Sequence, residues 1–254
     1  MAVPSFVGAG SPIYTAPFDP AASFTVTTGD LPATIQSNDL LFICVLNTGT
    51  GSALNPNNAY LSTDLTNAGY NSGGVRQGAT LTVFQLFLGF YDPSDFPVTV
   101  TRNPLSLVPT AARIETIAYR FVASVPTFSL PNVVTAGASA SETTLPTTTN
   151  KQASHVGGRA TQLTFQNSGN ISAVVNARST AERHRQTGIT GFGGGLVVAD
   201  TTVSGEDFVT YTHNLTGGAV LSVGMNPDGA PEPFTPGPRG LGGWGVGETK
   251  DEQW

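Results

Sequence analysis

Short apolar runs recur along this whole sequence, and each is rich in Val, Ile, Thr, Phe and Tyr and bounded by Gly, Pro, Asn or Asp. β-Branched and aromatic residues between turn-forming residues are typical of β-strands. The 30 glycines and 18 prolines among 254 residues interrupt most windows that are long enough for a helix. We therefore predict an all-β chain with almost no helix.

Ten strands are expected: Ser23–Thr27, Asp39–Leu46, Ala79–Phe90, Pro97–Thr101, Arg113–Val122, Gln162–Phe165, Ile171–Asn176, Gly195–Ala199, Phe208–His213 and Ala219–Gly224. The runs 39–46 and 83–88 are apolar on both faces, which indicates strands at the centre of packed layers. Two packed antiparallel sheets follow, in a β-sandwich of the jelly-roll kind.

The most continuously apolar strands supply the expected core. It includes Phe42, Val45, Val83, Leu86, Leu88, Ile117, Phe121, Val174 and Val197.

The sandwich domain is expected over residues 21–224, after an N-terminal extension over residues 1–20. Two loosely repeated halves, 21–130 and 151–224, each offer a strand, a long loop and two further strands. In this comparison Ile171–Asn176 takes the place of Asp39–Leu46. The pattern leaves open whether the halves form one sandwich or two domains.

The segment between the halves is polar. Thr143–Asn150 reads TTLPTTTN, which predicts an extended surface connection rather than a packed element.

Two loops are long for a compact domain. Asn47–Gly78 carries Tyr60 and Tyr70, and loops of this length are often functional, so both tyrosines are candidate contact residues. Ala177–Gly194 holds the densest charge cluster of the chain. It is either a solvated loop or helical turn, or a polar partner contact through Arg183 and Arg185.

The last segment, residues 225–254, holds five prolines and seven glycines and also both tryptophans of the chain. The Pro and Gly content predicts an irregular arm, whereas exposed tryptophan favours association. The expected assembly contacts are Phe234, Leu241, Trp244, Val246 and Trp254.

Charge excludes some partners. With 11 basic and 17 acidic residues the formal net charge is −6, which disfavours nucleic-acid binding.

No apolar stretch reaches the length of a membrane span, so no membrane insertion is expected.

The sequence lacks the common catalytic motifs, and we expect no catalytic, cofactor-binding or metal-binding residues. The single cysteine, Cys44, lies in an apolar run and is expected to be a buried thiol. Asp92 and Asp95 beside Pro93 fit turn chemistry.

Four segments carry a resemblance to a known family. Residues 25–42 (TVTTGDLPATIQSNDLLF), 79–88 (ATLTVFQLFL) and 114–121 (IETIAYRF) are similar to the opening and central strands of a loosely defined family of tailed-bacteriophage virion proteins, and Gly191–Ala199 is similar to its glycine-rich late strand. The resemblance implies a non-enzymatic structural or tail-associated role and supplies no catalytic residues.

The expected function is therefore that of a virion structural protein. It would be made in the host cytoplasm, form a homo-oligomer, and assemble with other virion proteins onto the tail or capsid through its loops and arm. The alternative is a module that binds host-surface glycans, with Tyr60 and Tyr70 as an aromatic platform. A third alternative is a hydrolase whose carboxylates meet only in the fold.

Overall fold

The structure is a computed structural model. It describes residues 4–14, 23–50, 60–77, 82–103, 108–125, 132–134, 141–146, 161–168, 171–176, 180–186, 195–202, 208–213 and 218–225. Antiparallel sheets make up these ranges almost entirely, so the predicted all-β fold is confirmed. The described residues contain one short α-helix, α1 (Thr63–Asn67), and two 3₁₀ turns, Thr28–Asp30 and Pro93–Asp95.

All ten expected strands are present: β3 (Ser23–Val26), β4 (Leu40–Thr50), β7 (Thr82–Phe90), β8 (Val98–Arg102), β9 (Val108–Arg120), β12 (Thr161–Ser168), β13 (Ile171–Asn176), β15 (Gly195–Thr202), β16 (Phe208–His213) and β17 (Gly218–Met225). Seven further strands were not expected: β1 (Ser5–Ala9), β2 (Ile13–Tyr14), β5 (Tyr60–Leu61), β6 (Asn71–Gln77), β10 (Asn132–Val134), β11 (Ser141–Pro146) and β14 (Thr180–Gln186). Strands therefore occupy parts of the segments interpreted as an N-terminal extension, a surface connection and two long loops.

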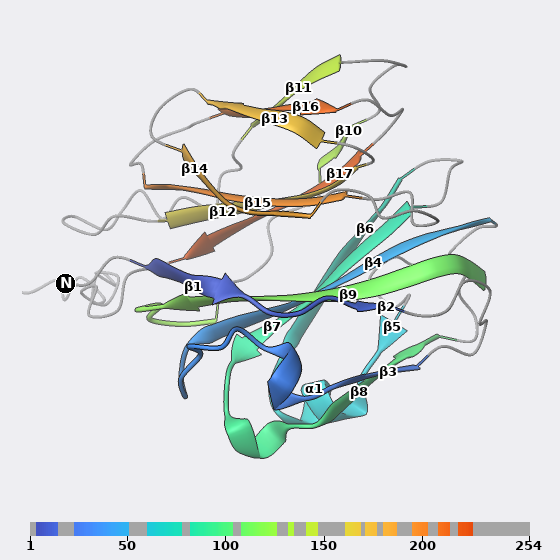
Figure 1. The fold of residues 1–254 in the computed structure, drawn as a ribbon, viewed down its shortest axis with the longest axis vertical. Helices are drawn as coiled ribbons and strands as arrows, with labels where there is room; N and C mark the ends of the chain where they lie inside the picture. The colour runs from blue at the N-terminus through green and yellow to red at the C-terminus, as the bar shows by residue number, and fades with distance from the viewer. Residues whose placement is uncertain are drawn as a thin grey trace, which may run out of the picture.

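Four sheets lie in layers (Figure 1). The two large sheets have the orders β1-β9-β4-β7-β6 and β10-β17-β12-β15-β14 and lie in the middle of the stack. The two small sheets, β3-β8-β5 and β11-β16-β13, lie on the outside. We call the middle layers the first and the second large sheet.

The chain repeats one topology twice. Each strand from β3 to β9 has a counterpart at the same place in the second half: β3-β8-β5 matches β11-β16-β13, and β9-β4-β7-β6 matches β17-β12-β15-β14. On the outer edge of β9 lie β1 and β2, and on the outer edge of β17 lies β10, whose register corresponds to that of β2. The counterpart of β4 is β12, whereas Ile171–Asn176 is the counterpart of β5, so the strand correspondence drawn from sequence was shifted by one element.

The two halves also contact each other in a reciprocal way. β6 of the first half packs on the edge strand β10 of the second, and β14 of the second half packs on the edge strand β1 of the first. β17 packs on β6 and β7, and its counterpart β9 contacts β14 and β15 through the side-chain pairs Glu115–His184 and Tyr119–Asp200. Reciprocal contacts of this kind define an isologous interface, as in a twofold dimer. The chain is thus built like a dimer whose two subunits are joined in one polypeptide.

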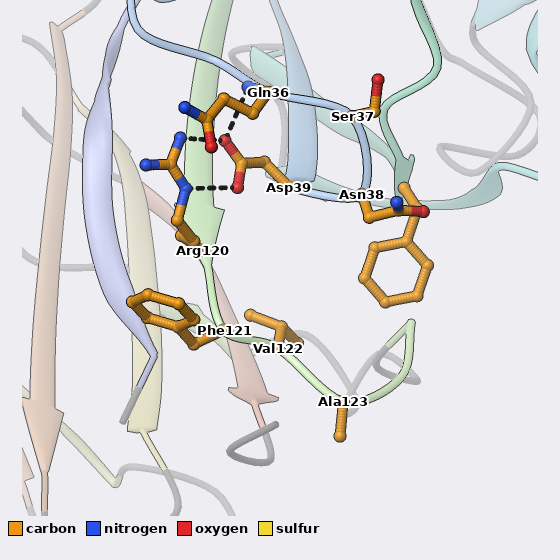
Figure 2. A pocket seen from close by; sticks show the side chains of 9 residues that line it. Gln36, Ser37, Asn38, Asp39, Arg120, Phe121, Val122 and Ala123 are labelled. Carbon is orange, nitrogen blue, oxygen red and sulfur yellow. Dashed lines mark hydrogen bonds and ion pairs between the residues drawn. The ribbon is translucent and has the colours of Figure 1, made fainter. Parts of the chain in front are cut away.

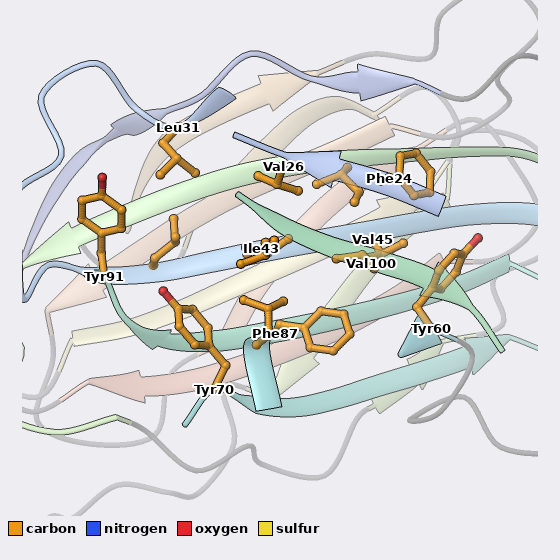
Figure 3. Packing of buried hydrophobic residues seen from close by; sticks show 14 of the residues in the cluster. Phe24, Val26, Leu31, Ile43, Val45, Tyr60, Tyr70, Phe87, Tyr91 and Val100 are labelled. Carbon is orange, nitrogen blue, oxygen red and sulfur yellow. The ribbon is translucent and has the colours of Figure 1, made fainter. Parts of the chain in front are cut away.

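Strand β4 explains the position of the core, because it is buried on both faces. Leu40, Phe42, Cys44 and Leu46 face the second large sheet, where Leu196, Val198 and Met225 complete the cluster. Leu41, Ile43 and Val45 face the small sheet β3-β8-β5 (Figure 3). The expectation of a two-faced apolar strand is confirmed.

The expected core is correct at Phe42, Val45, Leu86, Leu88 and Ile117, all of them fully buried. Phe121 is a correction, because its side chain is 44% exposed. The side chains of Val83, Val174 and Val197 lie outside the described part of the structure.

Candidate functional site

A group of ionisable side chains lies between the two large sheets. Glu115 on β9 is buried, and its Oε1 lies 2.6 Å from Nε of the fully buried Arg113. The other oxygen, Oε2, lies 2.6 Å from Nε2 of His184 on β14. Glu115 therefore connects the first half of the chain to the second through a polar contact.

A second polar contact crosses the same space. The hydroxyl of Tyr119 on β9 donates a hydrogen bond of 3.0 Å to Oδ2 of Asp200 on β15. Nε of Arg183 on β14 donates to the same oxygen at 2.8 Å, and this hydrogen bond raises the pKa of Arg183. Asp200 is only 4% exposed, so its carboxylate needs hydrogen-bond donors from the protein. Tyr119 and Arg183 provide them.

An irregularity in β14 makes both contacts feasible. The pairing of β14 with β15 shifts register between Glu182 and His184, which marks a β-bulge at Arg183. In a regular strand, consecutive side chains point to opposite faces. Here the consecutive residues Arg183 and His184 both reach partners in the layer between the large sheets.

The cysteine next to this group is not an activated nucleophile. Cys44 is directly opposite Glu115 in the β4–β9 ladder and is fully buried. Burial raises the pKa of its thiol well above the usual value, and the Glu115 carboxylate raises it further. The thiol is therefore protonated at neutral pH.

The expected contact tyrosines do not lie on the surface, which corrects the predicted aromatic platform. Tyr60 is 1% and Tyr70 6% exposed, and both belong to the core beneath the small sheet β3-β8-β5 (Figure 3). Burial raises the pKa of both hydroxyl groups. The ring of Tyr70 lies against Gly89, where an added Cβ would come within 2.6 Å of it.

A glutamine holds Tyr60 inside. Gln85 on β7 is fully buried; its Oε1 accepts from the backbone N–H of Tyr60 at 2.8 Å and its Nε2 donates to the Tyr60 carbonyl at 2.9 Å. The side-chain amide thus takes the place of a neighbouring strand for this residue, which satisfies two buried backbone groups.

The two expected contact arginines lie on strand β14, not on a loop. Arg183 is used by Asp200, as described. Arg185 donates from Nε and Nη2 to the two carboxylate oxygens of Glu182 at 2.7 and 2.6 Å. The expected assembly contacts Phe234, Leu241, Trp244, Val246 and Trp254 lie outside the described residues.

A surface pocket of about 350 Å³ opens where β4 begins and β9 ends (Figure 2). Its lining consists of two short segments and one aromatic ring: Gln36–Asp39, Arg120–Ala123 and Phe90. Nε and Nη2 of Arg120 donate to the two carboxylate oxygens of Asp39, both at 2.8 Å. These hydrogen bonds raise the pKa of Arg120 and fix both charged side chains on the pocket wall.

The segment Gln36–Asp39 is fixed as well. The backbone N–H of Gln36 donates to Oδ2 of Asp39 at 2.8 Å, and the N–H of Asp39 donates to the Gln36 carbonyl at 3.0 Å. The N–H of Asn38 bonds to the carbonyl of Tyr91 at 2.9 Å. This side of the pocket is therefore preformed.

Sequence reasoning missed this pocket. The sequence predicts a strand over Asp39–Leu46 and a core position for Phe121, because Arg113–Val122 is one of the most continuously apolar runs. The backbone of Phe121 instead turns to a positive φ of 63°, which a sequence pattern does not indicate for a phenylalanine.

Among the described residues no group of three or more His, Cys, Asp and Glu is arranged to hold a metal ion. The helix that the described ranges contain is too short to cross a membrane.

The fold defines the chain as an all-β protein of stacked antiparallel sheets. The chain matches no protein-family model, no curated protein and no solved structure.

Proposed function

We propose that this chain is a non-enzymatic structural protein of a tailed-bacteriophage particle, which assembles with other virion proteins onto the tail or capsid. The observation that carries the proposal is the duplicated topology with its reciprocal packing. β-Sandwiches are common building blocks of viral shells, and two of them joined face to face make a rigid unit.

The layer between the halves supports a load-transmitting role. Its apolar cluster comes from both large sheets and is crossed by the contacts Glu115–His184 and Tyr119–Asp200. Buried polar contacts fix the relative position of two surfaces more narrowly than apolar packing does, because each donor must meet one acceptor. The two halves then move as one body.

Assembly would use surfaces that the fold leaves outside this layer, together with the aromatic residues of the arm. The resemblance of residues 25–42, 79–88 and 114–121 to virion proteins favours the same role. The protein would reside in the virion and form a homo-oligomer there.

The arm provides the test. A chain that ends at Met225 keeps β17 complete, including the fully buried Met225 side chain. We expect it to fold with the thermal transition of the full chain and to remain a monomer in sedimentation, whereas the full chain forms an oligomer or joins particles assembled in infected cells.

A full-length variant with Trp244→Ser and Trp254→Ser is the matched control, because it keeps the length and charge of the arm. It should lose assembly as the shortened chain does. Normal assembly of both variants would contradict the proposed role of the arm, and a full chain that neither oligomerises nor enters particles would contradict the structural function.

A further inference from the structure

We infer that the pocket between Gln36–Asp39 and Arg120–Ala123 is a binding site for a neutral saccharide, with Phe121 as the stacking ring. The inference moves the glycan-binding alternative from the buried Tyr60 and Tyr70 to a site that exists on the surface. It does not depend on the proposed structural role.

The backbone of the pocket is unusual. The non-glycine residues with a positive φ in the described ranges are Asn38, at 69°, and Phe121, at 63°, and both line this pocket. Asparagine tolerates this conformation, but for phenylalanine it is strained. Strained conformations of this kind concentrate at binding sites, where they hold a side chain in a required place.

The strain at Phe121 has a clear structural effect. The next residue, Val122, returns to the core at 6% exposure, while Phe121 stays 44% exposed. Among the described residues the other large apolar side chains exposed to this degree are Tyr14 and Leu61, and neither lines the pocket. The turn therefore presents one aromatic ring at the edge of the pocket (Figure 2).

Polar groups surround the pocket as well. The side chains of Gln36, Ser37 and Asn38 make no hydrogen bond to any described residue, and Ser37 and Asn38 lie on the side of the pocket opposite Phe121 (Figure 2). Nη1 of Arg120 is likewise without a hydrogen bond to the described residues, since Asp39 and the Thr34 carbonyl take Nε and Nη2. The two carboxamides and the hydroxyl can both donate and accept hydrogen bonds, and the guanidinium nitrogen donates.

The charges on the pocket wall balance. The charged lining residues, Asp39 and Arg120, form a bidentate pair, so the wall carries no net charge. An anionic ligand could reach Nη1 of Arg120 but would lie against the Asp39 carboxylate, and a cationic one would have to compete with Arg120 for Asp39. A neutral ligand meets neither obstacle.

A pyranose fits these three features together. One face of its ring carries axial C–H groups that pack on an aromatic ring, and its rim carries hydroxyl groups that both donate and accept hydrogen bonds. A volume of about 350 Å³ is near the lower end of small-ligand pockets, which suits one or two sugar rings at the end of a glycan.

The test is binding of the full-length protein to an array of neutral mono- to tetrasaccharides, followed by saturation-transfer difference NMR and titration with the best of them. We expect saturable binding of at least one neutral saccharide. Phe121→Ala should weaken it at least tenfold, Phe121→Tyr should retain it, and Asn38→Gly should weaken it several-fold without loss of the backbone conformation.

Leu61→Ala is the matched control, because Leu61 is 46% exposed on β5 and does not line the pocket. It should leave the affinity unchanged. Thermal melts show whether each variant is folded. If Phe121→Ala does not fold, Phe121→Tyr and Asn38→Gly still test the site.

Three results would overturn the inference: no neutral saccharide binds, acidic saccharides or random peptides bind in place of neutral ones, or binding persists unchanged in Phe121→Ala. Each is independent of the assembly test, since the arm variants leave the pocket intact and the pocket variants leave the arm intact.

Discussion

The hydroxyl of Tyr119 and the carboxylate of Asp200 meet across the layer between the two large sheets, at 3.0 Å. The two residues lie 81 positions apart in the chain and belong to opposite halves. Asp200 also accepts from Arg183, so one buried carboxylate ties β9, β14 and β15 together. The relative position of the halves depends on this contact and on the one between Glu115 and His184.

Tyr119→Phe should lower the free energy of unfolding by about 1.5–3 kcal/mol, because it removes a hydrogen bond to a buried charge. Tyr70→Phe is the control: the Tyr70 hydroxyl is buried without a hydrogen-bond partner among the described residues, so its removal should be neutral or stabilising. Urea denaturation measures both. Equal effects of the two substitutions would show that the Tyr119–Asp200 bond contributes nothing.

Phe42 and Phe121 should respond very differently to replacement by Ala. Phe42 is fully buried and packs edge-on against Tyr119, with ring centroids 6.0 Å apart, so Phe42→Ala should cost about 3–5 kcal/mol. Phe121→Ala should change stability by less than about 1 kcal/mol, since the ring is 44% exposed. Thermal and urea unfolding compare them. A large loss at Phe121 would mean that its ring is part of the core.

The pair Glu182–Arg185 should make stability depend on pH in the acid range. Hydrogen bonds from Arg185 lower the pKa of Glu182 below its usual value of 4.5. The folded state thus binds this proton less readily than the unfolded state, so the contribution is present above pH 4.5 and is lost as the pH falls through the lower folded value.

Glu182→Gln tests this dependence, because it removes the titrating group and keeps the shape. The stability difference between the parent and this variant should be larger at neutral pH than at about pH 3. Urea denaturation at both pH values provides the measurement. A difference that grows on acidification would contradict the assignment.

The thiol of Cys44 should be unreactive in the folded protein. It is fully buried, and burial raises its pKa, so both access and ionisation are suppressed. A thiol-specific reagent such as 5,5′-dithiobis(2-nitrobenzoic acid) should react only after unfolding in concentrated urea. Rapid labelling of the native chain at neutral pH would show that the layer between the large sheets opens.

The sequence predicted those strands whose apolar residues are continuous. Strand β14 was missed because its residues Glu182–Arg185 are all charged or titratable, and charged residues normally indicate a solvated segment. They form a strand because each has a partner that comes from another element or across the bulge: Asp200, Glu115 and, for Glu182 and Arg185, one another. Those partners are remote in sequence, so no local pattern could indicate them.

The sequence predicted the duplicated topology only in part. The sequence showed two similar successions of strands and loops, but strand order depends on pairings between distant segments, such as β4 with β9 and β12 with β17. Hydrophobic alternation says which face of a strand is buried and not which strand lies beside it.

The sequence by itself determined the all-β class, the ten main strands, the buried thiol of Cys44 and the two-faced burial of β4, because each follows from local propensity and the spacing of apolar residues. Only the tertiary structure decided the reciprocal packing of the halves, the burial of Tyr60 and Tyr70, and the exposure of Phe121. These features depend on where a distant Gln85, Gly89 or Asp200 lies, and on a backbone turn whose energy is set by its surroundings rather than by its own residue type.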